Sequence, residues 1–230
     1  HQELIKRTNG YANENKISSV LFTFEPSPSD YFSKGKSQSR LTTLDEKYDY
    51  LRSGPIDFIY CPPFDQEMEN LSPLNFINQH LVRKLNAKHV VVGEDFHFAK
   101  DRSGSVETLM ELGLEYGFTV DPVEFIRQRD KKISSTNIRQ SLMDQDIQNA
   151  NQMLGRHYSV LGEVIKGNQI GRTIGYPTAN IDINERDVLL RGVFCVKAII
   201  EGDEDEYKGL ANIGFKPTIN GTALTLEVHL

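Results

Sequence analysis

The feature that most constrains the fold of this chain is a change of rhythm near Gly155. Before this residue, short runs rich in Val, Ile and Phe alternate with segments whose apolar residues have helical spacing. After it, short β-rich runs follow one another with only Gly, Asn and Asp turns between them. Strands separated by helices are typical of a parallel sheet, whereas consecutive short strands are typical of a small antiparallel barrel or sandwich. The sequence therefore predicts an α/β domain over 1–155 and a β domain over 156–230.

The first domain carries clear helix start signals. Thr43-x-x-Glu46 has the spacing of a capping box, and Ser72-Pro73 combines an N-cap serine with proline at the first helical position. A further helix is expected over 105–116, and one helical pattern extends from Ile138 to a C-cap at Gly155. Strands are expected at 19–24, 56–61, 89–92 and 118–123. Sheets of this kind bind ligands beyond the carboxyl ends of their strands.

The second domain is expected to consist of strands alone. The β-rich runs lie at 158–166, 193–201, 206–213 and 224–230, and an acidic turn at 201–206 is expected to be solvated. No helical pattern of any length separates them, which favours a small antiparallel barrel or sandwich.

The composition excludes several classes of protein. With 38% hydrophobic and 25% charged residues, the chain is typical of a folded globular protein. No apolar run approaches the roughly 18–20 residues needed to cross a bilayer, and a net charge of −6 argues against a general nucleic-acid binder. Cys61 and Cys195 form no C-x-x-C pair, so we expect neither a zinc site nor a disulfide framework, and a cytoplasmic location. The oligomeric state stays open.

A glycine-rich segment is the strongest local signal for a phosphate ligand. Three glycines stand within nine residues, at Gly167, Gly171 and Gly175. Such spacing allows the backbone to approach a ligand closely, and Arg172 offers a planar fork suited to phosphate oxygens. A glycine-rich hairpin without a ligand would give the same pattern.

Two neutral oxygen donors follow this segment. Thr178 and Asn180 lie two residues apart after Pro177, which places both on one side of an extended chain. Magnesium favours oxygen ligands and usually shares them with substrate phosphates. The alternative is a turn in which Thr and Asn bond to the backbone.

The last strand alternates between apolar and polar residues. Thr225, Glu227 and His229 share the polar face, and a carboxylate at Glu227 is suited to accept a proton from a substrate hydroxyl. A solvated strand face is the alternative for Glu227, and we expect a structural role for His229.

Two segments of the first domain suggest a second nucleotide site. Ser134, Ser135 and Thr136 stand at a helix start, where free amides attract phosphate, and Arg139 shares their helix face. An ordinary N-cap with a surface arginine is the alternative there.

The other segment leaves a strand at its carboxyl end. Gly93 and Asp95 stand there, and Asp95 is suited to bond a ribose or a base. An ordinary turn would carry the same residues.

In combination these motifs resemble a known family. The ordered series GRxxGxPTAN (171–180), RGV (191–193), ANIG (211–214) with a following PT, and LEVHL (226–230) closely resembles the riboflavin kinase domain. Over essentially the whole chain, the sequence is similar to the bacterial bifunctional riboflavin kinase/FMN adenylyltransferases. The resemblance implies a six-stranded barrel that transfers the γ-phosphate of ATP to the 5′-hydroxyl of riboflavin. It also implies Mg²⁺ on Thr178 and Asn180, Glu227 as the catalytic base, and nucleotide-binding residues at Gly167, Gly171 and Arg172.

The same resemblance extends to the first domain. The segment 134–139 matches the family's second nucleotidyltransferase motif, which binds ATP phosphates, and 93–98 and 23–28 match stretches that line the nucleotide site. The implied fold is a Rossmann-like nucleotidyltransferase domain. The implied reaction transfers AMP from ATP to FMN, giving FAD and pyrophosphate without a covalent enzyme intermediate.

The sequence departs from the family pattern at several positions. His1 corresponds to the final histidine of the family's H-x-G-H loop, so we expect a first domain shortened at its start, and a second domain shortened beyond Glu227. Ser27 stands where histidine is usual and Ala99 where glycine is usual. Two alternatives therefore stay open: a monofunctional riboflavin kinase with a non-catalytic nucleotide-binding domain, or a flavin or nucleotide sensor without turnover.

Overall fold

The computed structural model describes residues 1–33, 40–52, 54–128, 131–166, 177–183, 188–218 and 221–230. It consists of two compact units. Unit 1 comprises His1–Ser37 and Lys47–Lys132, and unit 2 comprises Gln38–Glu46 and Ile133–Leu230. The compact units therefore part between residues 132 and 133, whereas the sequence predicted a junction at 155. Within the described ranges, none of the helices combines the length and the apolar character that crossing a membrane requires.

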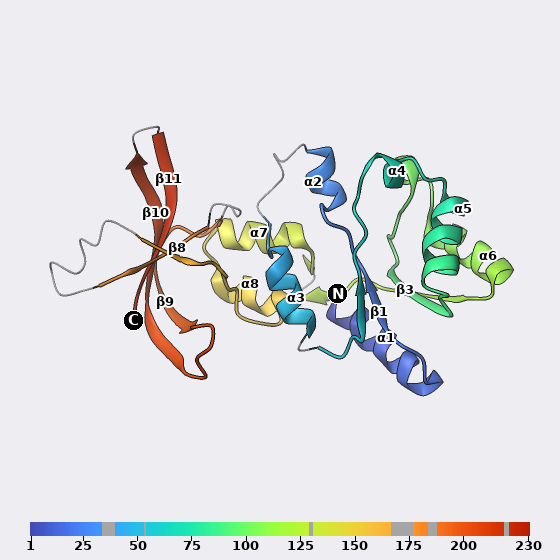
Figure 1. The fold of residues 1–230 in the computed structure, drawn as a ribbon, viewed down its shortest axis with the longest axis horizontal. Coiled ribbons are helices and arrows are strands. Elements are labelled where there is room, and N and C mark those ends of the chain that lie inside the picture. Colours follow the sequence, from blue (N-terminus) through green and yellow to red (C-terminus); the bar gives the residue numbers. More distant parts are fainter. Residues whose placement is uncertain (34–39, 53, 129–130, 167–176, 184–187, 219–220) are drawn as a thin grey trace. The chain divides into compact units, whose positions relative to one another are not determined.

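Unit 1 is built from strands in parallel pairs and from helices (Figure 1). Strand β1 (Val20–Phe22) pairs in parallel with β2 (Phe58–Tyr60), and β3 (His89–Gly93) pairs in parallel with β4 (Thr119–Val123). These four strands lie where the sequence predicted them, and the predicted parallel pairing is confirmed. The short strands β5 (Arg127–Gln128) and β6 (Lys131–Lys132) form an antiparallel pair.

The predicted N-cap at Ser72 is confirmed, and the helix expected over 105–116 is present. Ser72 accepts a hydrogen bond from the backbone of Asn75 at 3.2 Å and precedes α5 (Pro73–Phe76), which continues as the π-helix η1 (Ile77–Lys84). Ser105 and Thr108 form a capping box at the start of α6 (Val106–Tyr116). The remaining helical segments are α2 (Pro28–Phe32), α4 (Gln66–Glu69) and the 3₁₀ turn η2 (Lys100–Arg102). Helix α3 (Leu44–Arg52) begins in unit 2 and ends in unit 1.

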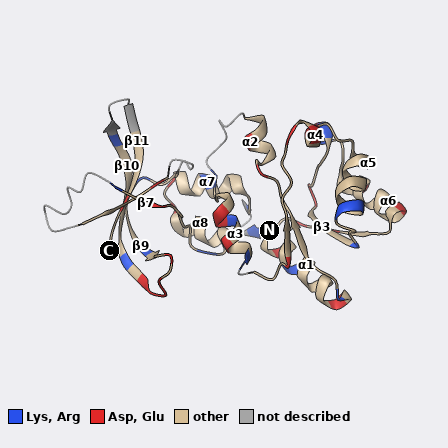
Figure 2. Ribbon diagram, viewed as in Figure 1, with Lys and Arg blue, Asp and Glu red and all other residues tan. Residues whose placement is uncertain are grey.

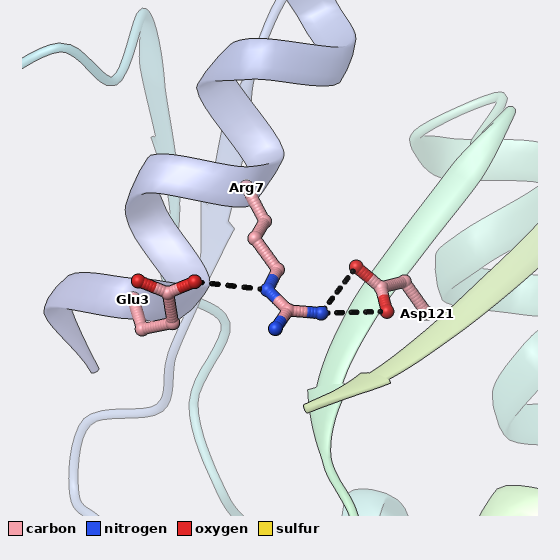
Figure 3. A network of polar contacts seen from close by, with 3 residues as sticks. All are labelled: Glu3, Arg7 and Asp121. Atoms are coloured by element: carbon pink, nitrogen blue, oxygen red, sulfur yellow. Dashed lines mark hydrogen bonds and ion pairs between the residues drawn. The ribbon is translucent and has the colours of Figure 1, made fainter. Parts of the chain in front are cut away.

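The first helix, α1 (Gln2–Asn15), was not predicted from the sequence. Polar and aromatic contacts join it to the β3–β4 pair. Arg7 donates to both carboxylate oxygens of Asp121 on β4, at 3.1 and 3.3 Å, and to Glu3 at 3.0 Å (Figure 3). The ring of Tyr11 stacks on His89 with centroids 3.9 Å apart. Ala12 is its one buried residue.

The core of unit 1 lies between these helices and strands. Its buried members are hydrophobic side chains from α4 to β4: Met68, Leu71, Phe76, Ile77, Leu81, Phe98, Leu109 and Phe118. Ser19 and Asp57, which directly precede β1 and β2, link the two strands, because Asp57 accepts hydrogen bonds from both the backbone and the hydroxyl of Ser19 at 2.8 Å.

Unit 2 contains a five-stranded antiparallel sheet (Figure 1). The order is β7 (Val164–Ile165), β8 (Ala179–Ile181), β11 (Gly221–His229), β10 (Glu206–Thr218) and β9 (Gly192–Ile199). The prediction of an antiparallel β region is confirmed in this coarse form. The acidic turn between β9 and β10 is exposed, as expected (Figure 2).

The predicted C-cap at Gly155 is confirmed by its left-handed conformation. The prediction of one helical pattern from Ile138 to Gly155 was wrong. The segment forms two helices, α7 (Ser135–Met143) and α8 (Ile147–Leu154). Gln145 adopts a positive φ of 61°, which ends the first helix, and Asp146 then caps α8 by accepting from the backbone of Asn149 at 3.1 Å. A non-glycine residue in this conformation gives no reliable signal in the sequence.

Helices α7 and α8 share one core with the sheet of unit 2. Ile138, Leu142 and Ala150 pack in the same cluster as Ala211, Ile213 and Leu226. The buried Glu46 adds a polar tie: one carboxylate oxygen completes the capping box with the backbone of Thr43 at 2.8 Å, and the other accepts from the backbone of Leu161 at 2.9 Å. Residues 38–46 and 133–154 therefore belong structurally with the β region.

Candidate active site

The most specific grouping of polar residues lies on one face of the sheet in unit 2. Asn180 on β8 lies opposite Glu227 on β11, and Glu227 lies opposite Asn212 on β10. Opposed residues of an antiparallel pair project on the same face with Cβ atoms about 4.5–5.5 Å apart. The other face carries Ala211, Ile213 and Leu226, which are buried in the core. The alternation therefore brings an amide and a carboxylate together on the outward face.

Thr178 stands just before β8, two residues from Asn180. It is exposed, whereas Asn180 is half-buried between β7 and β11. His229 reinforces this segment, because its Nδ1 lies 2.8 Å from the carbonyl oxygen of Pro177. This contact fits the structural role expected for His229.

Glu227 is paired with a residue that the sequence analysis did not single out. The ammonium group of Lys216 on β10 donates to Oε1 of Glu227. The Glu227 side chain is 20% exposed and the Lys216 side chain 47%. Lys216 lies four residues after Asn212 on the same strand, so the two side chains share one face, and this spacing could have revealed Lys216. Using it requires knowing the register of the β10–β11 pair.

The glycine-rich segment cannot be compared with its prediction. Gly167, Gly171 and Arg172 lie outside the described residues.

A second grouping lies at the start of α7. Ser134 is the N-cap and accepts from the backbone of Asn137 at 3.2 Å, while Ser135 and Thr136 are exposed in the first turn and Arg139 is half-buried one turn further on. We call these four residues the phosphate motif. Exposed hydroxyls and backbone amides at a helix start are suited to bind an anion.

A third grouping follows strand β3 in unit 1. Gly93 ends the strand and Asp95 is exposed beyond it, with its Oδ2 3.1 Å from the ammonium of Lys132. Lys132 also lies over the ring of Phe125 at 3.1 Å from the centroid. His1, expected in the same nucleotide site, is exposed and forms the N-cap of α1. The phosphate motif belongs to unit 2, so the structure does not describe its position relative to Asp95.

The loop after β3 is held in an unusual conformation. Phe98 and Gly104 form an isolated bridge, and a Cβ at Gly104 would stand 2.6 Å from the ring of Phe98, so a larger residue there would require this buried ring to move. Ala99 takes φ 65° and ψ −175°, a region that is essentially restricted to glycine. Strained positions of this kind are common beside ligand sites.

The fold and these groupings define a class: a two-domain protein in which parallel α/β elements precede an antiparallel sheet with an amide, a carboxylate and a lysine on one face. Two family models match this arrangement, FAD synthetase over residues 1–137 and riboflavin kinase over residues 154–230. The bifunctional riboflavin kinase/FMN adenylyltransferase of Buchnera aphidicola subsp. Schizaphis graminum is 40% identical over the whole chain, which covers 74% of that protein. Its counterpart in Escherichia coli K12 is 36% identical over the whole chain, which covers 73% of it.

A solved structure has the same fold. A Streptococcus pneumoniae protein, described as a macrolide-efflux protein, superposes with a TM-score of 0.84 at 28% identity, covering the whole of this chain and 74% of that one. On the family models and the full-length match to relatives above 30% identity, this chain belongs to the bifunctional riboflavin kinase/FMN adenylyltransferase family.

Proposed function

We propose that the chain phosphorylates riboflavin to FMN and adenylylates FMN to FAD, with ATP as the co-substrate of both steps. The matches to a FAD synthetase and a riboflavin kinase model in one chain support this double activity. The observation that carries the kinase half is the direct opposition of Asn180 and Glu227 on one sheet face.

Glu227 is proposed as the catalytic base of the kinase. Its side chain is half-buried and shares one face of the sheet with Asn180 on β8. In phosphoryl transfer such a group orients the attacking hydroxyl and accepts its proton, and surrounding positive charge stabilises the phosphoryl group. Gly167, Gly171 and Arg172 are proposed to contribute nucleotide contacts from the glycine-rich segment.

The donor set around Asn180 fits magnesium. Among the described residues there is no group of three or more His, Cys, Asp or Glu side chains that could enclose a metal ion. Magnesium is commonly bound through few protein oxygens, usually one or two carboxylates, together with water and substrate phosphates. Thr178 and Asn180 would supply neutral oxygens, so the substrate phosphates would carry most of the negative charge around the ion. A bound Mg²⁺ would neutralise phosphate charge in the kinase site.

The adenylyltransferase is proposed to use the phosphate motif with Gly93, Asp95 and His1. Ser134 already caps α7, so the hydroxyls of Ser135 and Thr136 remain exposed at the helix start and Arg139 lies one turn away. These groups would bind the phosphates of ATP, while Asp95 would bond the ribose or the base. Positioning and charge neutralisation are sufficient for transfer of AMP.

Finer features of the assignment are also proposals. They are a six-stranded barrel for the kinase region, a Rossmann-like first domain with the functional boundary at 155, and a cytoplasmic protein whose partners are small molecules. The five-stranded sheet, the parallel strand pairs and the free Cys61 and Cys195 support them.

The test is to incubate the protein with riboflavin and Mg-ATP and to separate the flavins by chromatography. FMN that is then converted to FAD is the expected result. FMN alone would favour the monofunctional kinase, and unchanged riboflavin would favour the sensor without turnover. A parallel incubation that starts from FMN measures the second step independently of the first.

A further inference from the structure

Lys216 and Glu227 face one another along the outward surface of the β10–β11 hairpin. Lys216 lies opposite Ala223, and Glu227 lies opposite Asn212, so both side chains project on the same face. The ammonium reaches Oε1 of the carboxylate across the position of Gly214. A Cβ added to Gly214 would meet no atom within 4 Å, so the surface between them has open space.

This ion pair joins an exposed lysine to a half-buried glutamate. Exposed pairs contribute little to stability because water competes for both charges. Here the Glu227 side chain as a whole is 20% exposed, and its carboxylate is the group proposed to act on the substrate hydroxyl. A charge-assisted hydrogen bond fixes the direction of a carboxylate more firmly than a neutral bond does.

We infer that Lys216 is a positioning residue of the kinase site, an inference that rests on the proposed function. By holding Oε1 of Glu227, Lys216 restricts the rotamers of this side chain and leaves Oε2 to act on the substrate hydroxyl. The lysine stem is flexible and its ammonium carries three donors, so this hold adapts as substrates bind. Without it, the Glu227 side chain samples other rotamers and the base is misplaced.

The experiment compares Lys216→Met with Lys216→Arg in FMN formation from riboflavin and Mg-ATP. Lys216→Met is expected to lower kcat by about ten- to a hundredfold, the cost of misplacing a reacting group, with KM for ATP and riboflavin within about twofold of the unmodified value. Lys216→Arg keeps a cation and should recover most of kcat. Lys208→Met is the matched control, since Lys208 lies on the same strand and the same face.

A double variant separates positioning from folding. If Lys216 acts through Glu227, Lys216→Met should add less than about twofold to the loss already caused by Glu227→Gln. Losses of kcat that multiply in the double variant would overturn the inference. A raised KM for ATP with an unchanged kcat would also overturn it, as would equal rates for Lys216→Met and Lys208→Met. Failure of the unmodified protein to form FMN would instead overturn the proposed kinase activity, and the inference with it. Normal FMN formation by both the unmodified protein and the Lys216→Met variant would contradict the inference and leave the proposed kinase activity intact.

Discussion

Asn180 on β8 is the direct cross-strand neighbour of Glu227 on β11, so an amide and a carboxylate that are far apart in the sequence share one sheet face. The pairing depends only on backbone register. It brings the segment proposed to bind magnesium next to the proposed catalytic base, and the predictions below follow from it and from the local structure around it.

Asn180→Ala should raise the magnesium concentration needed for half-maximal FMN formation by about tenfold or more, because it removes one of the two protein oxygens proposed to hold the ion. The measurement is a magnesium titration at fixed ATP. Asn212→Ala is the matched control, since Asn212 also lies opposite Glu227 but on the other strand. An equal shift in both variants would contradict a metal role for Asn180.

Arg139→Ala should abolish most conversion of FMN to FAD while FMN formation from riboflavin persists. The arginine lies one turn beyond the capped start of α7, where phosphate is expected. Each step is assayed by chromatography from its own substrate. Gln140→Ala, a change at the next position of the same helix, serves as the control. An undiminished FAD yield would remove Arg139 from the phosphate site.

Ala99→Gly should stabilise the protein by about 1 kcal/mol, because the backbone at this position has a conformation that strains any residue with a Cβ. The check is the midpoint of urea unfolding followed in the same buffer. Ala99→Val should shift the midpoint in the opposite direction. A loss of stability on introducing glycine, as at an ordinary alanine, would show that the loop is not strained.

Asp57→Asn should lower the free energy of unfolding at neutral pH and should lower it less in acid. Hydrogen bonds from the backbone and then the hydroxyl of Ser19 hold the pKa of Asp57 below its ordinary value. A lowered folded-state pKa adds stability above the unfolded-state pKa of about 3.9, and that stability is lost as the pH falls through the folded value.

The free energy of unfolding is therefore compared at pH 7 and near pH 3 for the Asp57→Asn variant. The difference in the free energy of unfolding between this variant and the unmodified protein should be smaller in acid. Glu14→Gln, a change at an exposed carboxylate of α1, is the control and should show no such decrease. A difference in the free energy of unfolding that stays constant across this range would argue against an ionised Asp57 in the hydrogen bonds with Ser19.

Elements with local signals were predictable from the sequence. The cap at Ser72, the helix over 105–116 and the β-rich run at 89–92 lie where expected, since helix and strand patterns are read within a few residues. Helix α1 was missed because it is held by Arg7 and Tyr11 contacts to distant strands. The break at Gln145 was missed because its positive φ has no local signature.

The candidate site was predictable only in part. The residue types at Thr178, Asn180 and Glu227 indicated oxygen donors and a base, but their opposition follows from strand register, which the sequence does not specify. Lys216 was missed for the same reason, since its partner is chosen by the β10–β11 pairing.

The most direct measurement is the fate of flavins in a Glu227→Gln variant. The substitution keeps the shape of the side chain and removes its capacity to accept a proton, so FMN formation from riboflavin should fall by about a hundredfold or more, while conversion of supplied FMN to FAD continues at the unmodified rate. FMN formation that survives the substitution, or an equal loss of both steps, would contradict a base at Glu227 acting in a separate kinase site.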